Sequence, residues 1–137
     1  MALDHLPPVS VTDPSADDWT RGFWEEAANE QLVATCCDRC GTFRMPPGRF
    51  CRACGSQDFT WKPLPGTGTV FTCTVVRSGT GSPYVPAVVE ADGAPGVRFV
   101  SAVVDCNPDE VAAGTRVHVV WHRVSDTLTL PYWTLAE

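Results

Sequence analysis

The hydrophobic positions near the N-terminus repeat at the spacing of an α-helix. Trp19, Phe23 and Ala27 recur every four residues, and polar residues fill the opposite face. Asp13, followed by a proline and a serine, is a typical start signal, because it offers a capping side chain before a first-turn proline. This pattern predicts an amphipathic helix over roughly residues 15–31. Residues 1–12, which include two adjacent prolines, are expected to form a loose tail.

The aromatic side of this helix has two interpretations. Trp19, Phe23 and Trp24 could pack on the core of the chain itself, or they could form an interface with another protein. The rest of the chain is small and offers few surfaces that would cover the helix. Both interpretations stay open on the sequence.

Beyond residue 65 the pattern changes to alternation and β-branched residues, which is typical of strands. Five strands are predicted, at residues 68–76, 84–90, 97–104, 116–122 and 127–130. Between the third and fourth strands, Asn107, Pro108 and Gly114 supply the cap, first-turn and stop signals of a single helical turn. Five short strands with this insert match an OB-fold barrel of about 70 residues. The expected fold class is mainly β, with an N-terminal amphipathic helix.

Two identical cysteine motifs lie between the helix and the strands. Cys37 and Cys40 belong to the first C-x-x-C-G, and Cys51 and Cys54 to the second. This spacing lets each pair of sulfur atoms turn toward one ion, and the glycine permits the positive φ of a tight loop. Four thiolates favour Zn²⁺, and short strands at residues 42–45 and 49–50 would complete a zinc ribbon. Because four protein sulfur atoms leave no open coordination position, the zinc is expected to be structural.

The remaining cysteines and histidines form no convincing catalytic group. Cys36 falls outside the spacing of the two motifs. Cys73 and Cys106 lie in or beside predicted strands, where small core residues are expected. His118 and His122 share one predicted strand and fit ordinary barrel or surface positions. The residues by themselves therefore indicate a binding or assembly module.

Charge is distributed unevenly along the chain, whose net charge is −6. Residues 1–38 hold eight acids and one base, residues 39–62 hold one acid and five bases, and residues 63–137 hold seven acids and four bases. These changes predict three segments: a tail and docking helix (1–34), a zinc ribbon (35–62) and an OB-fold domain (63–137). The acidic barrel argues against nucleic acid as a partner, since clustered positive charge binds phosphate backbones.

Several features bear on the compartment in which the protein works. No apolar run is long enough to cross a bilayer, and the N-terminus lacks the basic and apolar regions of a secretory signal. Seven cysteines without such a signal indicate metal ligands or free thiols in a reducing compartment. We therefore expect a cytoplasmic protein with no membrane partner.

Several motifs follow one another in a characteristic order. They are Phe23-Trp24-Glu25, the first cysteine motif, Met45-Pro46-Pro47, the second cysteine motif, Gly66-Thr67-Gly68-Thr69-Val70 and Asp105-Cys106-Asn107-Pro108. This order, over roughly residues 17–131, resembles the DUF35 family, described as zinc-ribbon OB-fold acyl-CoA-associated proteins. The resemblance implies a rubredoxin-like zinc ribbon with the metal on Cys37, Cys40, Cys51 and Cys54, followed by a C-terminal OB barrel.

The resemblance also implies a function. Family members typically associate with thiolase-like proteins, as in acyl-CoA thiolase complexes and the aldolases of steroid side-chain degradation, and help to hold the acyl-CoA. We therefore expect a non-catalytic acyl-CoA-binding and assembly subunit of a thiolase-like (retro-)aldolase or thiolase. The alternatives are a nucleic-acid-binding module built from the ribbon and the barrel, and a free-standing enzyme that uses Cys106 or His118.

The basic segment is where the chain can meet the three phosphate groups of coenzyme A. The candidate ligand contacts are Arg44, Arg49, Arg52 and Lys62, with Phe50 and Trp61 placed to stack on adenine or to line an acyl channel. Alternatively, these cations only solubilise the ribbon or pair with the acidic residues at 17–30. Both interpretations stay open on the sequence.

Overall fold

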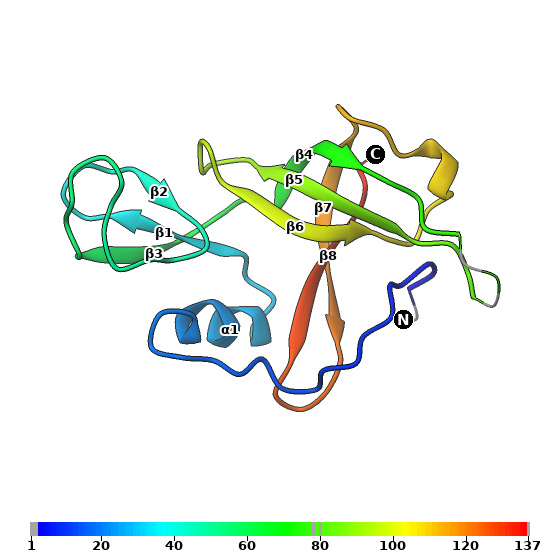
Figure 1. The fold of residues 1–137 in the computed structure, drawn as a ribbon, viewed down its shortest axis with the longest axis horizontal. Helices are drawn as coiled ribbons and strands as arrows, with labels where there is room; N and C mark the ends of the chain where they lie inside the picture. The colour runs from blue at the N-terminus through cyan, green and yellow to red at the C-terminus, as the bar shows by residue number, and fades with distance from the viewer. Residues whose placement is uncertain (1–2, 78, 80, 137) are drawn as a thin grey trace.

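A computed structural model describes residues 3–77, 79 and 81–136 of the chain, with a three-stranded sheet at one end, a closed barrel at the other and one α-helix beside their junction (Figure 1). The elements are α1 (Arg21–Ala28), β1 (Val33–Cys37), β2 (Phe43–Arg44), β3 (Phe59–Pro63), β4 (Thr67–Cys73), β5 (Val85–Ala91), β6 (Arg98–Val103), the 3₁₀ turn η1 (Pro108–Glu110), β7 (Arg116–Arg123) and β8 (Thr129–Leu135). The predicted fold class is confirmed: the protein is mainly β, with a five-stranded barrel.

The helix is shorter than its hydrophobic spacing predicts. It begins at Arg21 and ends at Ala28, so the predicted start near Asp13 and the predicted span of 15–31 are wrong. The cause is Asp17, whose carboxylate accepts hydrogen bonds from the backbone N–H groups of Trp19 and Thr20, at 2.9 Å each. A side chain that satisfies local backbone donors in this way stabilises a turn and delays the helix.

The buried face of α1 packs on the chain itself. Phe23 and Ala27 are buried, and the Phe23 ring lies 6.5 Å from the Trp61 ring of the sheet and 6.1 Å from the Phe99 ring of the barrel, measured between centroids. The helix therefore joins the two β units into one hydrophobic core. None of the helices in the described residues has the length and apolar character needed to span a bilayer.

Gly22 is required where the helix meets the sheet. A Cβ atom at this position would lie 2.2 Å from the indole nitrogen of Trp61 and 2.7 Å from its Cδ1. Because no side chain fits in that space, glycine allows the helix backbone to lie directly on the Trp61 ring.

The first sheet has the order β2-β1-β3, with Thr35 of β1 paired to Arg44 on one side and to Trp61 on the other. The strand expected at 42–45 is present as β2, whereas residues 49–50 form a bend and not a strand. The sheet is instead completed by β1 and β3. Three consecutive residues of β1, from Val33 to Thr35, are buried, so this strand lacks the alternation that would reveal it.

The barrel has the strand order β4-β5-β6-β8-β7 and closes by pairing β7 with β4. All neighbours are antiparallel except β6 and β8, which run parallel and pair at the single position Val103↔Trp133. Trp133 is fully buried. The predicted strands are present with bounds shifted by at most three residues, except that β8 continues to Leu135, well beyond the predicted end at residue 130. The predicted helical turn is present as η1, and the Asn107 side chain caps it.

The N-terminal segment is ordered along the barrel, so the expected loose tail is wrong for residues 3–12. Leu3 and Leu6 pack against a small cluster that includes Tyr132. The backbone carbonyl of Thr12 accepts a hydrogen bond from the hydroxyl of Thr127 at 3.1 Å. Apolar contacts at one end and hydrogen bonds at the other hold the tail on the outside of the barrel, because the barrel alone would leave that apolar surface exposed.

Candidate metal centre and adjoining apolar pocket

The two cysteine motifs bring four sulfur atoms together at the end of the three-stranded sheet. All four Sγ atoms, from Cys37, Cys40, Cys51 and Cys54, lie within 4.8 Å of one another. The Cys37–Cys54 and Cys40–Cys51 pairs are separated by 3.6 Å and 3.5 Å. A tetrahedral zinc with bonds of about 2.3 Å places its sulfur ligands roughly 3.8 Å apart. The cluster therefore has the size of a Cys₄ zinc site.

The loops that carry these sulfur atoms have the same conformation. Gly41 and Gly55, which end the two motifs, have the same φ of 78°. Their N–H groups donate to the carbonyl oxygens of Cys37 and Cys51, at 2.9 Å in both cases. Glycine takes this left-handed conformation without strain, so each motif can close tightly around the metal.

At two of the four cysteines, Cys37 and Cys51, the backbone also favours the thiolate form that binds zinc. Hydrogen bonds from the backbone N–H groups of Cys54 and Ala53 lower the pKa of the Cys51 thiol to about 6. The backbone N–H of Cys40 is the main cause that lowers the pKa of the Cys37 thiol. Four converging sulfur donors fit one Zn²⁺ and leave it no open position. The ion would supply folding energy to the ribbon, not a reactive site.

The other cysteines and histidines lie apart from this cluster. The thiol of Cys36 donates to the carbonyl oxygen of Gly41 at 3.4 Å and is not among the four converging sulfur atoms. Cys73 and Cys106 are partly buried against the core. Burial is the main reason that the pKa of the Cys106 thiol is raised, because it disfavours the charged thiolate. Within residues 3–77, 79 and 81–136, no cysteine, histidine and acid are joined by hydrogen bonds into a catalytic set.

The cations of the ribbon differ from those elsewhere in the chain. In the part of the chain that the structure describes, five arginines outside the ribbon each form an ion pair with an acid: Arg21, Arg77, Arg98, Arg116 and Arg123. The five cations of residues 39–62 appear in none of these pairs. The suggested pairing between these cations and the acidic residues at 17–30 is therefore absent from the described structure.

The predicted ligand residues fall into two groups. Arg49, Phe50 and Arg52 are exposed in the loop of the second cysteine motif, and Phe50 retains 55% of its accessible surface. Lys62 is exposed on β3, opposite Ala34 of β1. Trp61, by contrast, is partly buried under α1.

Arg44 is buried, with 7% of its surface accessible. Its Nε donates to the carbonyl oxygen of Gly48 at 3.1 Å, and its guanidinium carbon lies 5.2 Å from the centroid of the Phe59 ring. Its two terminal nitrogens have no hydrogen-bond partner among the described residues. The contact with the Phe59 ring compensates only part of the free energy that the guanidinium loses when it leaves water. Arg44 is therefore a buried cation and not the exposed phosphate contact that the sequence predicted.

The three aromatic residues of the N-terminal segment also have different environments. Phe23 is buried in the core, which confirms the first interpretation for this residue. Trp19 lies 6.4 Å from the Phe59 ring and stays partly exposed. Trp24 packs edge-on against Phe23 and lines a pocket on its other side. Whether Trp19 and Trp24 also contact a partner stays a prediction.

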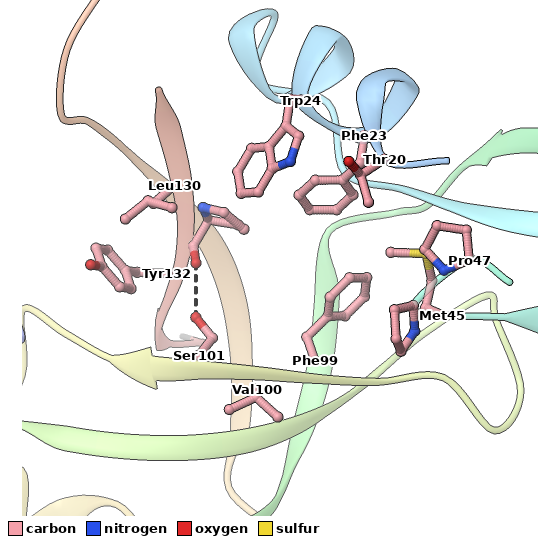
Figure 2. A pocket seen from close by; sticks show the side chains of 12 residues that line it. Thr20, Phe23, Trp24, Met45, Pro47, Phe99, Val100, Ser101, Leu130 and Tyr132 are labelled. Atoms are coloured by element: carbon pink, nitrogen blue, oxygen red, sulfur yellow. Dashed lines mark hydrogen bonds between the residues drawn. The ribbon is translucent and has the colours of Figure 1, made fainter. Parts of the chain in front are cut away.

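This pocket has a volume of about 400 Å³ and lies where the helix, the ribbon and the barrel meet (Figure 2). In Figure 2, α1 covers it from above, β6 runs below it, and β8 and the Met45–Pro47 loop stand on opposite sides. Most of its lining is apolar: Phe23, Trp24, Met45, Pro46, Pro47, Phe99, Val100, Leu130 and Pro131. The polar side chains are those of Thr20, Ser101 and Tyr132. A concave apolar surface with few polar groups is typical of binding sites.

The sequence did not reveal this pocket. Its lining comes from four separate segments, at residues 20–24, 45–47, 99–101 and 130–132, which only the folded chain brings together. One signal was available: Pro131, which follows the last predicted strand, lies inside β8 and cannot complete a ladder of hydrogen bonds.

Comparisons with known proteins identify both β units. A family model described as ChsH2, rubredoxin-like zinc ribbon domain, matches residues 24–60, and one described as ChsH2, C-terminal OB-fold domain, matches residues 61–122. A DUF35 domain-containing scaffold protein of Methanocaldococcus jannaschii is 32% identical over 101 residues, which are 69% of this chain and 70% of that protein. The probable enoyl-CoA hydratase alpha subunit of Thermomonospora curvata is 38% identical over 129 residues; the match covers 90% of this chain and 40% of the longer relative.

Solved structures agree with these matches. A chain of the Ltp2-ChsH2(DUF35) aldolase superposes with a TM-score of 0.82 and 33% identity, covering 90% of this chain and 99% of the other. A DUF35 family protein of unknown function from Sulfolobus solfataricus shares the fold, with a TM-score of 0.67 and 12% identity over 89% of this chain and 86% of the other. The matched ribbon domain and the four-sulfur cluster support one structural zinc. By sequence, fold and metal site, the chain belongs to the DUF35 family.

Proposed function

We propose that this chain is a scaffold subunit that holds an acyl-CoA within a complex with a thiolase-like enzyme, an aldolase. The observation that carries the proposal is the match to the Ltp2-ChsH2(DUF35) aldolase, which extends over 99% of the matched chain with a TM-score of 0.82. A likeness that includes the helix, the ribbon and the barrel supports a common role better than a shared ribbon alone would.

The charge of the ribbon supports the acyl-CoA part of this proposal. Arg49 and Arg52 lie in one exposed loop, form no ion pair in the described structure and flank the exposed ring of Phe50. Guanidinium groups bind phosphate in a bidentate manner, and an exposed aromatic ring can stack on adenine. Lys62 adds a further exposed cation on the ribbon. Arg44 is buried, so we do not include it among the residues proposed to contact the phosphates.

The absence of a reactive group in the described residues supports a non-catalytic role. The zinc is enclosed by four sulfur atoms, so it offers no position for water or substrate. Cys106 carries a raised thiol pKa, whereas a nucleophilic cysteine needs a lowered one. The thiolase-like partner would then supply the catalytic residues, and this chain would supply binding and geometry.

Purification of the tagged chain from its native cells tests the assembly part of the proposal. Mass spectrometry of the purified complex should identify a thiolase-like protein in a fixed ratio to the chain. If the zinc-loaded chain elutes alone from several native preparations, the scaffold role is wrong.

Calorimetric titration with acetyl-CoA tests the ligand part, with the chain alone and in the complex. The double variant Arg49→Gln/Arg52→Gln should weaken binding on the order of tenfold or more, since a charge-assisted hydrogen bond contributes roughly 1.5–3 kcal/mol. Arg123→Gln is the control, because Arg123 is also exposed but pairs with Asp126 on the barrel. Equal affinities of the double variant and the control would contradict phosphate binding by the ribbon.

A further inference from the structure

The barrel is closed at one seam by only a short contact. Strands β6 and β8 run parallel and pair at Val103↔Trp133, where the N–H of Val104 donates to the carbonyl oxygen of Trp133 at 2.7 Å. On its other side, β6 is paired with β5 along its whole length, from Arg98 to Val103. Most of the β6 edge that faces β8 is therefore left without a neighbouring strand.

Pro131 explains why the seam opens. The next position of the parallel ladder would place Pro131 opposite Ser101, and the N–H of residue 131 would donate to the carbonyl oxygen of Val100. Proline has no N–H, so this hydrogen bond cannot form. The Pro131 carbonyl oxygen is instead bound by the side chain of Ser101, whose hydroxyl donates to it at 2.8 Å (Figure 2). The two strands diverge beyond this bond.

Val100 is left with its backbone groups directed at the seam. Backbone N–H and C=O groups alternate sides along a strand, and those of Val104 face β8, so those of Val100 face the same side. Within the described residues, β8 pairs with β6 only at Val103, so no strand pairs with Val100 on this side. The Val100 side chain retains 87% of its accessible surface, although it is a β-branched apolar residue in the middle of a strand.

The apolar pocket lies beside this free edge. Phe99, Val100 and Ser101 form its floor, and Leu130 to Tyr132 form one side (Figure 2). Trp24 faces β6 from the opposite side of the pocket, and Met45 stands beside it. The protein thus presents, at one place, unpaired backbone donors and acceptors and a pocket of about 400 Å³ for apolar side chains.

We propose that the seam between β6 and β8 binds an extended segment of a partner protein, which pairs with β6 at Val100 and inserts an apolar side chain under α1. The identity of the partner rests on the proposed function, in which it is the thiolase-like subunit. A strand added by the partner would supply the backbone hydrogen bonds to Val100 that Pro131, which has no N–H, cannot make. Alternate side chains of the added strand would give specificity.

The geometry favours this occupant over two others. A second copy pairing edge to edge would bring its own sheet toward the seam, where α1 lies across the pocket from β6 (Figure 2). A single extended chain avoids this obstacle. An apolar small molecule would fill the pocket and leave the N–H and C=O of Val100 unpaired, so it accounts for only half of the observation.

Hydrogen exchange of the free chain and of its complex with the thiolase-like subunit tests the proposal directly. The amide of Val100 should exchange rapidly in the free chain and at least tenfold more slowly in the complex. Phe99 and Ser101, whose backbone groups face β5, are internal controls and should be protected in both states. If the complex forms but the Val100 amide stays unprotected, strand addition is wrong while the proposed function stands. Protection of other backbone amides at the pocket, with the Val100 amide still exchanging rapidly, would mean that the pocket is occupied without strand pairing and would also overturn it.

The second test does not depend on that complex. Dodecapeptides selected from a random display library against the zinc-loaded full chain should bind wild type and Val100→Thr alike, and Val100→Pro at least tenfold more weakly. Proline at position 100 removes the N–H that faces the seam and no hydrogen-bonding group that faces β5, while its ring also fixes φ at that residue. Zinc content and thermal melting check that this variant folds; if it does not, exchange of the Val100 amide in the peptide complex replaces it. If the selected peptides bind Val100→Pro as tightly as wild type and leave the Val100 amide unprotected, the seam does not bind an extended segment. This result would hold even if no thiolase-like partner exists.

Discussion

At the scale of single residues, the ion pair between Asp92 and Arg116 fixes the end of the barrel that receives the chain from the ribbon. The Arg116 guanidinium binds both carboxylate oxygens of Asp92, at 3.1 Å and 2.6 Å, and the Thr67 hydroxyl donates to the same carboxylate at 2.6 Å. Three strand ends, those of β4, β5 and β7, meet in this cluster. Hydrogen bonds from Arg116 and Thr67 lower the pKa of Asp92 to about 2 from its ordinary value of 3.8.

This lowered pKa predicts the acid sensitivity of the barrel. Because the folded-state pKa lies below the unfolded one, the stabilisation by the carboxylate is complete above about pH 4 and is lost as the pH falls toward 2. The melting temperature of the wild type should therefore fall by several degrees between pH 4 and pH 2, as followed by circular dichroism. Asp92→Asn should melt lower at pH 6 and lose less over that interval. An equal loss in both proteins would show that the acid sensitivity originates elsewhere.

Single residues also set the limit of prediction from the sequence. The four zinc ligands could be identified because two C-x-x-C-G motifs at this distance require only local geometry. The burial of Arg44 beside Phe59 and of Trp61 under α1 could not, because both depend on contacts between segments that a run of basic residues does not show. Pro131 was visible as a residue, but its effect on the β6–β8 seam follows only from the strand order of the barrel.

At the scale of elements, the ribbon depends on its metal because its sheet is too small to fold on hydrophobic burial alone. Native mass spectrometry should detect one zinc per chain in the wild type. Cys40→Ser should lose the metal and unfold the ribbon, with loss of the β1–β3 signals in a two-dimensional NMR spectrum. Cys36→Ser is the matched control and should keep the metal, since Cys36 is outside the four-sulfur cluster. A metal-free Cys40→Ser protein with an unchanged spectrum and melting temperature would contradict a structural zinc.

The helix makes two kinds of contact that two substitutions can separate. Phe23→Ala should lower the free energy of unfolding by about 3 kcal/mol, because Phe23 is buried between the ribbon and the barrel. Trp24→Ala should cost only about 1 kcal/mol, since Trp24 is partly exposed at the pocket, but it should weaken partner binding. Denaturant unfolding and co-purification measure the two effects. Equal losses of stability would mean that Trp24 is simply part of the core.

The elements of the barrel could be predicted better than those around it. Alternating apolar residues define β4 to β7, because each of these strands has one face on the core and one toward solvent. The helix start was predicted too early, since the Asp17 turn competes with the helical pattern. The tail was predicted to be loose, since its contacts with the Tyr132 cluster are long-range.

At the scale of the whole molecule, the protein combines a metal-held ribbon and a barrel that one short helix joins. Its exposed, unpaired cations lie on the ribbon, and its apolar pocket lies at the junction with the barrel. In the proposed function, the charged surface would bind the phosphates of acyl-CoA and the apolar one would bind a partner.

The measurement that tests this account most directly is steady-state turnover of the reconstituted complex with variants of this chain. Uniform binding of phosphates lowers KM without changing kcat, so Arg49→Gln/Arg52→Gln should raise KM for acyl-CoA on the order of ten- to a hundredfold, with kcat nearly unchanged. His118→Ala, His122→Ala and Cys106→Ala should each leave kcat within a few-fold. A collapse of kcat in any of these three, with the complex assembled and acyl-CoA still bound, would show that this chain carries catalytic chemistry and would contradict the scaffold role.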